Sequence, residues 1–458
     1  DEQVNGRVSR IAEMKVLRAH YYFELSRLFN KIPYFDENVE ISQYPDIPNN
    51  EFTRDEILSM LAKEMLDAAE LLPASQSEVG RIHKYIALAY AAKIKLYQAD
   101  QQGETTHAVT SINKELLREV VSLCDQVTAS NRYGLLDDFQ GLDLVANENG
   151  KESVFAIQYS MNDGTESAGR INWSNLLNSP GGGSPYGGDG FFLPSQDLIN
   201  AYQTDANGLP DFNYQSKSDY SWAVLNNGVY TLQNTTPNVD PRLDFVVGRP
   251  TITWKTYPDK PCEGWVRDKD TYGYNCAKRF WVSPESSDMF NGWPWGASQL
   301  NWQIIRYADI LLWKAEALIE LNEGDGLETA RDLINQIRNR ARNSAYVKDF
   351  NDHSNYAANY LVNPYPADVW NQDYARQALR WETRLEKALE GERFFDLVRW
   401  GIVETTMNKY ITAESDNRIY YANAHFTGGK DEYYPVPNNQ YGFSGGKYVQ
   451  NPGYAPFN

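Results

Sequence analysis

Apolar side chains recur at three- and four-residue steps along several long stretches of the chain, and this periodicity limits its fold more than any other feature. Such spacing places the apolar side chains on one face of an α-helix. The first half of the chain contains four predicted helices, at residues 11–29, 55–72, 81–97 and 114–129. In the first of them the expected buried face consists of Ile11, Met14, Leu17, Tyr21, Leu25 and Leu28. Thr53 and Glu56 have the spacing of a capping box, which supports the start of the second.

The same periodicity returns in the last third of the chain. Residues 304–342 predict two helices joined at Gly324-Asp325-Gly326, a hairpin of the size of a tetratricopeptide-type unit. Residues 81–129, with an Ala-rich first helix, are a second candidate unit. Residues 373–390 and 391–410 predict a last helical pair, and the tail at 433–458 is expected to wrap the surface.

Between residues 133 and 303 the helical periodicity is lost, and Gly, Asn, Asp and Pro become frequent. Such a composition predicts loops with a few short strands. Residues 153–159 and 243–247 are candidate strands, and residues 194–202 a candidate short helix. The Gly-rich segment 181–190 is expected to be a surface loop.

These patterns predict a mainly α protein in three parts that pack as one compact unit. The parts are residues 1–132 (helical, tetratricopeptide-like), 133–303 (loop-rich and ligand-binding) and 304–458 (tetratricopeptide-like helices and a wrapping tail).

Charge and hydropathy exclude whole classes of function. The 43 Lys and Arg residues are outnumbered by 61 Asp and Glu residues, a net charge of −18, which argues against a nucleic-acid partner because phosphate binding needs a basic surface. The mean hydropathy is −0.59, and no apolar run approaches the ~20 residues of a spanning helix, so the chain is not an integral membrane protein.

No catalytic or metal-binding motif is evident. The five His residues are isolated from one another, and the Gly-rich segment matches neither a nucleophile elbow nor a phosphate-binding loop. A glycosidase needs two suitably spaced carboxylates, but nothing selects one pair among 61 acidic residues. No cofactor is predicted. A structural calcium ion held by carbonyl groups would leave no sequence signal.

Tryptophan is concentrated in the loop-rich part. Six of the twelve Trp residues lie between positions 254 and 302. Large aromatics in long loops suggest exposed platforms on which sugar rings stack, and the alternative is that they fix the loops to the helical body. The predicted ligand-binding residues are Trp254, Tyr257, Trp265, Tyr272, Tyr274, Trp281, Trp293 and Trp295. Trp313, Trp381 and Trp400 lie on predicted helices and are expected in the core.

The three cysteines allow at most one disulfide. Cys262 and Cys276 are separated by 13 residues within the aromatic segment, and they are either a bridge, worth roughly 3 kcal/mol on the chain-entropy model, or two thiols. Cys124 falls on an apolar helix face and is expected to be a buried thiol.

Several segments resemble, in matching order, the motifs of SusD/RagB-like proteins. They are residues 18–33 (RAHYYFELSRLFNKIP), 240–244 (DPRLD), 306–317 (RYADILLWKAEA), 335–341 (NQIRNRA), 384–401 (RLEKALEGERFFDLVRWG), 434–437 (YPVP) and 450–454 (QNPGY). The resemblance spans most of the chain. We expect these motifs to be structural, because residues 390–401 carry enough charge and aromatic surface to lock two helices together.

The resemblance implies a function and a location. Members of this family are outer-membrane lipoproteins, exposed on the cell surface of Bacteroidetes, that bind glycans or other nutrients without catalysis and cover a SusC-like TonB-dependent transporter. They begin with a lipoprotein signal, an acylated Cys and an earlier helix, whereas this chain opens close to the Arg18 helix. A lipid anchor is therefore expected only from the resemblance.

Three functions follow as hypotheses. The first is a surface glycan-binding protein that passes an oligosaccharide to a barrel partner and would use starch or another glycan for nutrient uptake. The second is a helical glycoside hydrolase, and the third is a repeat scaffold that binds peptides or proteins. The glycan itself cannot be named from the sequence.

Overall fold

The structure, a computed structural model, is mainly helical. It describes residues 6–165, 169–173, 178, 181, 183–221, 223–226, 229–232, 237–255, 264–273, 275–290, 292 and 296–457.

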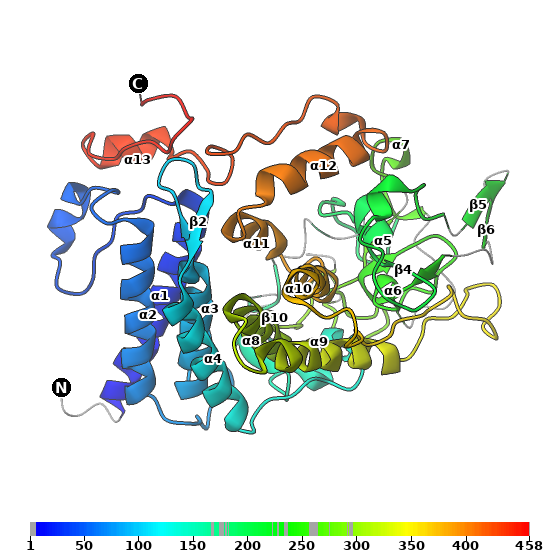
Figure 1. The fold of residues 1–458 in the computed structure, drawn as a ribbon, viewed down its shortest axis with the longest axis horizontal. Helices are drawn as coiled ribbons and strands as arrows, with labels where there is room; N and C mark the ends of the chain where they lie inside the picture. The colour runs from blue at the N-terminus through cyan, green and yellow to red at the C-terminus, as the bar shows by residue number, and fades with distance from the viewer. Residues whose placement is uncertain are drawn as a thin grey trace.

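Four long helices form the N-terminal part (Figure 1). They are α1 (Arg7–Phe29), α2 (Arg54–Leu71), α3 (Lys84–Ala99) and α4 (Lys114–Ala129), with the 3-10 turn η1 (Ile41–Asp46) between the first two. The predicted capping box starts α2, because the Thr53 hydroxyl accepts from the Glu56 N–H and the Glu56 carboxylate accepts from the Thr53 N–H. The small side chains of α3 are fully buried, so α2 and α4 pack closely on either side of it.

The predicted buried face of α1 is correct only in part: Leu17 and Leu25 pack, partly buried, against the core. Ile11, Met14 and Tyr21 are 44 %, 59 % and 69 % exposed. The helix instead buries a neighbouring stripe that includes Ala12, Val16, Ala19 and Phe23. Ala residues permit close approach to α2, so small side chains, which add little to a hydrophobicity pattern, decide the orientation of this helix.

The strands form two-stranded antiparallel sheets. The connection between α3 and α4 contains β1 (Asp100–Gln102) and β2 (Val109–Ile112), which pair as a hairpin. The other pairs are β3 (Ser153–Ile157) with β10 (Trp302–Arg306), β4 (Gln203–Thr204) with β7 (Asn238–Val239), β5 (Ala223–Asn226) with β6 (Val229–Leu232), and β8 (Val247–Gly248) with β9 (Cys276–Ala277).

The middle of the chain is otherwise irregular, as predicted, with short helical turns. These are η2 (Phe139–Asp143), η3 (Val145–Asn147), α5 (Gln196–Ala201), η4 (Tyr214–Ser216), α6 (Leu243–Val246) and α7 (Lys269–Tyr272). The predicted short helix is confirmed as α5, which begins at the N-cap Ser195. The predicted strand at residues 243–247 is wrong: most of it is the helical turn α6, stabilised by buried charges that an apolar pattern does not register.

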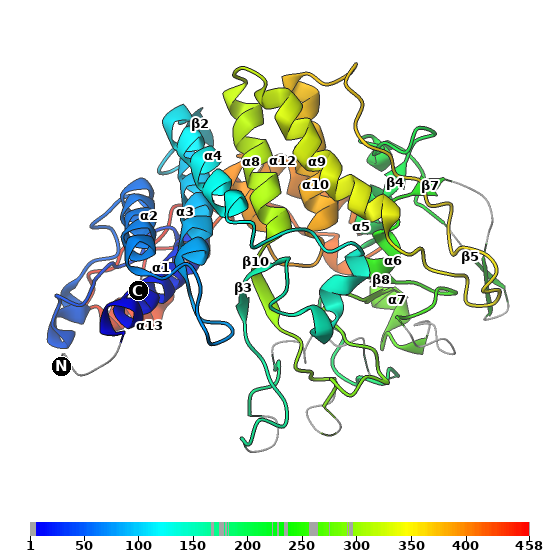
Figure 2. The same ribbon diagram turned by 90° about the horizontal axis from the view of Figure 1, so that it is seen from below.

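The C-terminal helices extend the N-terminal row. The predicted hairpin consists of α8 (Tyr307–Leu321) and α9 (Gly326–Asn343), and residues 304–306, predicted to start it, belong to strand β10 (Trp302–Arg306). Helix α4 packs against α8, and α10 (Gln372–Glu386) packs against both α8 and α9. Figure 2 shows these helices side by side, with the irregular middle part beneath them.

The last predicted helix is two helices. Helix α11 (Arg393–Arg399) has Trp400 as its C-cap, and α12 (Val403–Ser415) begins three residues after this cap and is followed by η6 (Ile419–Tyr421). Gly401 makes the bend with a φ of 65°, in the left-handed region that favours glycine. A Cβ there would lie 2.9 Å from Cγ2 of Val109 in β2, so the close approach also requires glycine.

Buried ion pairs join the middle part to the C-terminal helices. Arg242 bonds Asp240 at 2.7 Å and, from α10, Glu382 at 2.7 Å and Glu386 at 3.1 Å. Arg306 also bonds Glu386, at 2.9 Å. All five side chains are almost fully buried. Charges buried this deeply are tolerated only as satisfied pairs, so the SusD-like motifs that contain Asp240, Arg242 and Arg306 have a structural role, as expected.

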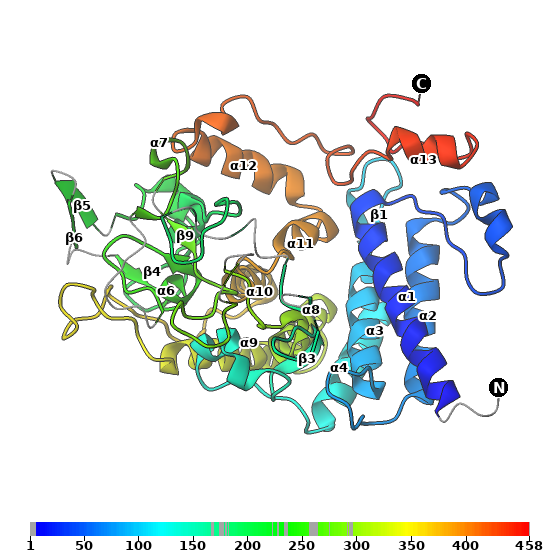
Figure 3. The same cartoon turned by 180° about the vertical axis from the view of Figure 1, so that it is seen from behind.

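The C-terminal tail packs on the end of the first helix. The Tyr434 N–H donates to the Leu28 carbonyl at 2.8 Å, and the Asn451 side chain donates to the Phe29 carbonyl at 2.8 Å. These carbonyls lie in the last turn of α1, where no intrahelical donor remains. The tail, including α13 (Asn438–Phe443), lies beside α1 in Figure 3, as the prediction of a wrapping tail required.

Candidate ligand-binding site

Three of the predicted platform residues are buried. Trp254, Trp265 and Trp281 are 1 %, 3 % and 2 % exposed and surround the fully buried ring of Tyr186. The Trp254 indole N–H donates to the Tyr186 hydroxyl at 3.1 Å, which in turn donates to the Val282 carbonyl at 2.6 Å. These rings present no face for stacking. They agree instead with the alternative interpretation, in which the tryptophans fix the loops to the body of the protein.

The Gly-rich segment explains this burial. It was expected to be a surface loop, but it carries Tyr186 into the cluster. A Cβ on Gly181 would lie 2.3 Å from the Trp265 carbonyl oxygen, and one on Gly296 would lie 2.9 Å from Cβ of Tyr186. Glycine therefore allows backbone segments to meet around the indoles.

The remaining predicted residues differ in position. Tyr272, at the end of α7, is 44 % exposed and stays a candidate. Tyr257, Tyr274, Trp293 and Trp295 lie outside the described residues. Cys262 also lies outside them, so its bridge to the buried Cys276 stays a prediction. Cys124 is buried in the helical core, where burial raises the pKa of its thiol to about 12.

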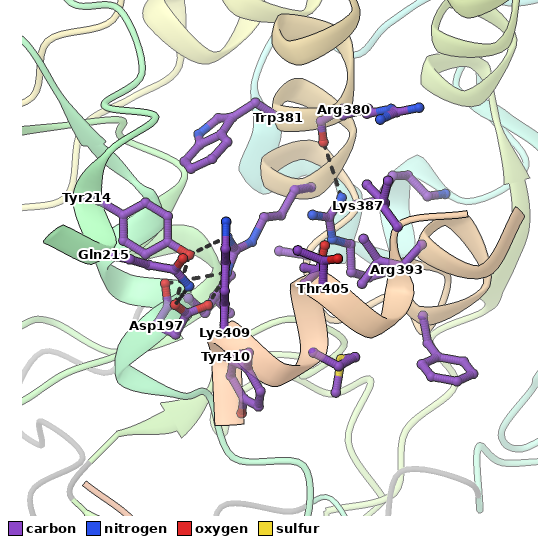
Figure 4. A pocket seen from close by; sticks show the side chains of 18 of the residues that line it. Asp197, Tyr214, Gln215, Arg380, Trp381, Lys387, Arg393, Thr405, Lys409 and Tyr410 are labelled. Atoms are coloured by element: carbon purple, nitrogen blue, oxygen red, sulfur yellow. Dashed lines mark hydrogen bonds and ion pairs between the residues drawn. The ribbon is translucent and has the colours of Figure 1, made fainter. Parts of the chain in front are cut away.

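A large cavity lies elsewhere in the described part of the chain, among α10, α11, α12 and the α5–η4 segment (Figure 4). Its volume is about 910 Å³, at the upper end of the range typical of ligand pockets. Of the helical Trp residues expected in the core, Trp313 and Trp400 are there, but Trp381 is only half-buried and lines this pocket.

Aromatic rings form one end of the pocket. The Trp381 ring centroid lies 5.2 Å from that of Phe212 and 5.4 Å from that of Tyr214, both edge-on. The Trp381 indole N–H donates to the Ala201 carbonyl at 3.1 Å, which fixes the ring. Burial raises the pKa of Tyr214 to about 12, so this hydroxyl is protonated over the physiological range.

Polar groups at this end are already ordered. Asp197 accepts from the Tyr214 hydroxyl at 2.8 Å, from the Gln215 amide at 2.9 Å and from the Arg384 guanidinium at 2.6 Å. Figure 4 shows Asp197, Tyr214 and Gln215 together on one side of the pocket, with Arg380, Lys387 and Arg393 on the other. A preformed wall of this kind loses little side-chain entropy when a ligand binds.

A ladder of tyrosines continues from the pocket to the surface. Tyr410 of α12 and Tyr421 of η6 line the pocket, with ring centroids 5.6 Å apart and hydroxyls 3.1 Å apart. The Tyr421 ring lies 4.6 Å from that of Tyr420, which lies 5.9 Å from that of Tyr272. Tyr420 is 51 % exposed. Figures 1 and 3 both place α7 at the end of α12, which brings Tyr272 to this ladder.

Sequence reasoning missed most of this site. The local signal was the Tyr420-Tyr421 pair in a polar segment, and its place in the pocket depends on the break at Gly401, after which α12 packs against α5. Helix α12 buries only Val403 and Glu414, so Thr405, Lys409 and Tyr410 remain available to the pocket.

The described residues contain no group of three or more His, Cys, Asp and Glu side chains placed to hold a metal ion. In that part of the chain no helix has both the length and the apolar character needed to cross a membrane.

A helical body with an open, aromatic-lined pocket is the architecture of a binding protein. Residues 151–454 match the family model of the SusD family, and the chain belongs to this family. Its relatives include SusD-like protein P2 of Formosa agariphila (24 % identical, covering 97 % of this chain and 74 % of the relative) and a SusD-like protein of Bacteroides ovatus (22 % identical, 87 % and 61 %). The chain thus spans less than two thirds of the latter.

Solved structures share the fold. A SusD homolog from Bacteroides thetaiotaomicron superposes with a TM-score of 0.68 at 18 % identity, covering 98 % of this chain and 79 % of the other. Surface glycan-binding protein A of the same species, in complex with laminarihexaose, gives 0.57 at 19 % identity, with 97 % and 78 % covered. The predicted mainly α, SusD-like fold is confirmed.

Proposed function

We propose that this protein binds a glycan at the cell surface and holds it in the pocket among α10, α11 and α12. The observation that carries the proposal is that two groups of aromatic rings line one pocket. Trp381 packs with Phe212 and Tyr214 at one end, and Tyr410 and Tyr421 are continued toward the surface by Tyr420 and Tyr272. Sugar rings have apolar C–H faces that stack on aromatic rings, and a series of rings suits an oligosaccharide. Relatives described as glycan-binding and laminarin-binding support the proposal.

The test is a binding screen against plant, host and microbial glycans by affinity electrophoresis, followed by titration calorimetry. We expect a dissociation constant in the micromolar to millimolar range, about −8 to −4 kcal/mol. Trp381→Ala and Tyr421→Ala should each weaken binding about tenfold or more. Tyr21→Ala, which removes a 69 % exposed ring on α1, should not. Unchanged binding in both site variants would place the ligand elsewhere.

The glycosidase hypothesis finds less support in the pocket. The two acidic side chains among its described lining residues are Asp197 and Asp373. The Asp197 oxygens already accept three hydrogen bonds, and the side chain of Asp373 is 92 % exposed and pairs with Arg376 at 2.9 Å. Neither resembles a general acid in an apolar setting. Sustained release of reducing ends from any bound glycan would contradict binding without catalysis.

Transfer of the ligand to a SusC-like TonB-dependent transporter, and anchoring at the outer membrane by an N-terminal lipid, are parts of the same proposal. Membership of the SusD family supports them. The full-length lipoprotein should co-purify from outer membranes with a large barrel protein, and its isolation alone in mild detergent would count against a stable complex.

A further inference from the structure

The wall of the pocket is basic, although the protein as a whole is acidic. Among its described lining residues are two acidic side chains and six basic ones, whereas the chain carries a net charge of −18. The basic ones are Arg376, Arg380, Arg384, Lys387, Arg393 and Lys409.

Three of these cations are neutralised by carboxylates of the protein. Arg384 bonds Asp197, and Arg376 bonds Glu320 at 2.6 Å. Lys387 bonds Asp309 and Glu390, each at 2.7 Å. These ion pairs hold the helices together, and they leave no uncompensated positive charge to attract a ligand.

The other three have no carboxylate within ion-pairing distance among the described residues. Lys409 is exposed on α12, and Arg393 is half-buried at the start of α11. One N–H group of Arg393 donates to the Arg380 carbonyl at 3.3 Å, the one hydrogen bond of this guanidinium within the described chain. A guanidinium has five N–H donors in a planar fork, so most of its capacity remains for a ligand.

Arg380, Arg393 and a third arginine, Arg399, all contact the ring of Trp400. The guanidinium carbons of Arg380 and Arg393 lie 5.0 and 5.7 Å from the Trp400 ring centroid, and that of Arg399 lies 4.9 Å from it. Arg399 bonds Glu316 and Asp396. Burial, reinforced by the Arg384 guanidinium, lowers the pKa of Arg393 to about 9. The charge of Arg393 is thus incompletely compensated, and an anion beside it would stabilise that charge.

We propose that the pocket takes an anionic glycan and places a carboxylate or sulfate group of the ligand against Arg393 and Lys409. Guanidinium and ammonium groups bind such oxyanions by charge-assisted hydrogen bonds, which are stronger than neutral ones. The aromatic end of the pocket then holds the sugar rings and the basic end selects their charge. This inference rests on the proposed glycan binding and deepens it.

The test compares two matched pairs of hexasaccharides by titration calorimetry. One pair is a galacturonate hexamer and its methyl ester, which differ by carboxylate charge. The other is a sulfated galactan hexamer and its desulfated form. We expect at least one charged member to bind tenfold or more tightly than its neutral partner at 50 mM NaCl, with the difference shrinking at 500 mM because salt screens the charges. The pair that responds identifies the anion.

Variants locate the effect. Arg393→Gln and Lys409→Gln should each lower affinity for the charged hexamer about three- to tenfold, and Arg393→Lys should retain most of it. Lys63→Gln, at a 73 % exposed lysine of α2, is the matched control and should bind normally. Equal melting temperatures exclude misfolding.

Two results would overturn the inference, and they differ in whether they also contradict the proposed glycan binding. If neutral glycans of the screen or the neutral hexamers bind as tightly as the charged ones, with Arg393→Gln and Lys409→Gln unaffected, the site is neutral and glycan binding stands. If no glycan of the screen and no hexamer binds, both proposals fail.

Discussion

At the scale of single residues, the structure distinguishes buried tryptophans from accessible ones, which the sequence alone does not tell apart. Trp254 is enclosed by Tyr186 and Trp265, whereas Trp381 faces a pocket from a helix. The composition correctly pointed to aromatic residues as candidates for ligand binding. Aromatic side chains in loops become buried, however, where glycines allow distant backbone segments to approach each other. No local sequence pattern indicates such an approach.

Trp254→Ala should therefore act on stability. Removing an indole that is 1 % exposed leaves a cavity, and we expect a loss of about 3–5 kcal/mol in the free energy of unfolding, measured by urea denaturation. Phe443→Ala, at a 71 % exposed ring, should change it by less than about 0.5 kcal/mol. A Trp254→Ala protein of normal stability that no longer binds glycan would restore the platform hypothesis.

At the scale of elements, the sequence predicted the helices well wherever periodicity was long, as in α2, α4 and the α8–α9 hairpin. It did not predict the division of residues 391–410 into α11 and α12, because hydrophobic spacing continues across the bend. The division depends on the φ of Gly401 and its contact with Val109, a residue nearly 300 positions away. Side-chain packing from another part of the chain thus determines where the pocket wall lies.

Gly401→Ala should weaken both the fold and the site. The left-handed φ and the contact with Val109 predict a loss of about 2–3 kcal/mol in unfolding free energy. A shift of α12 should also reduce glycan affinity in calorimetry. Gly442→Ala, where the added methyl meets nothing within 4 Å, is the control and should be neutral in both assays. Normal affinity in a destabilised Gly401→Ala protein would separate the bend from the site.

At the scale of the whole molecule, buried charges connect parts that the sequence presents as separate. The SusD-like motifs were expected to be structural, but their distant partners could not be read from spacing. Arg242 pairs with Asp240 of its own segment and also with Glu386, which is 144 residues away. We propose that residues 133–303 and 304–458 unfold together for this reason.

Acid should reveal this coupling. Burial alone would raise the pKa of Glu386, but the guanidinium groups of Arg340, Arg306 and Arg242 lower it to about 2. The stability from these pairs is present above the unfolded pKa of about 4.5 and is lost as pH falls toward 2. Helical circular dichroism and Trp fluorescence should therefore be lost in one transition over this window.

Glu386→Gln tests the same network at neutral pH. Breaking a buried pair leaves uncompensated arginines, so unfolding at pH 7 should cost about 3–5 kcal/mol less. Its stability should also vary less with pH between 4.5 and 2 than that of the unchanged protein. Separate transitions for dichroism and fluorescence in the unchanged protein would contradict unfolding as one unit.

The contact between the tail and α1 has a consequence for how the chain folds during synthesis. A ribosome synthesises α1 long before the tail, yet the carbonyls of Leu28 and Phe29 receive donors from Tyr434 and Asn451. Until the tail has been synthesised, the Leu28 carbonyl lacks its donor and bonds water. Helix α1 of the nascent chain thus reaches its native environment only after the segment that contains Tyr434 and Asn451 has been made.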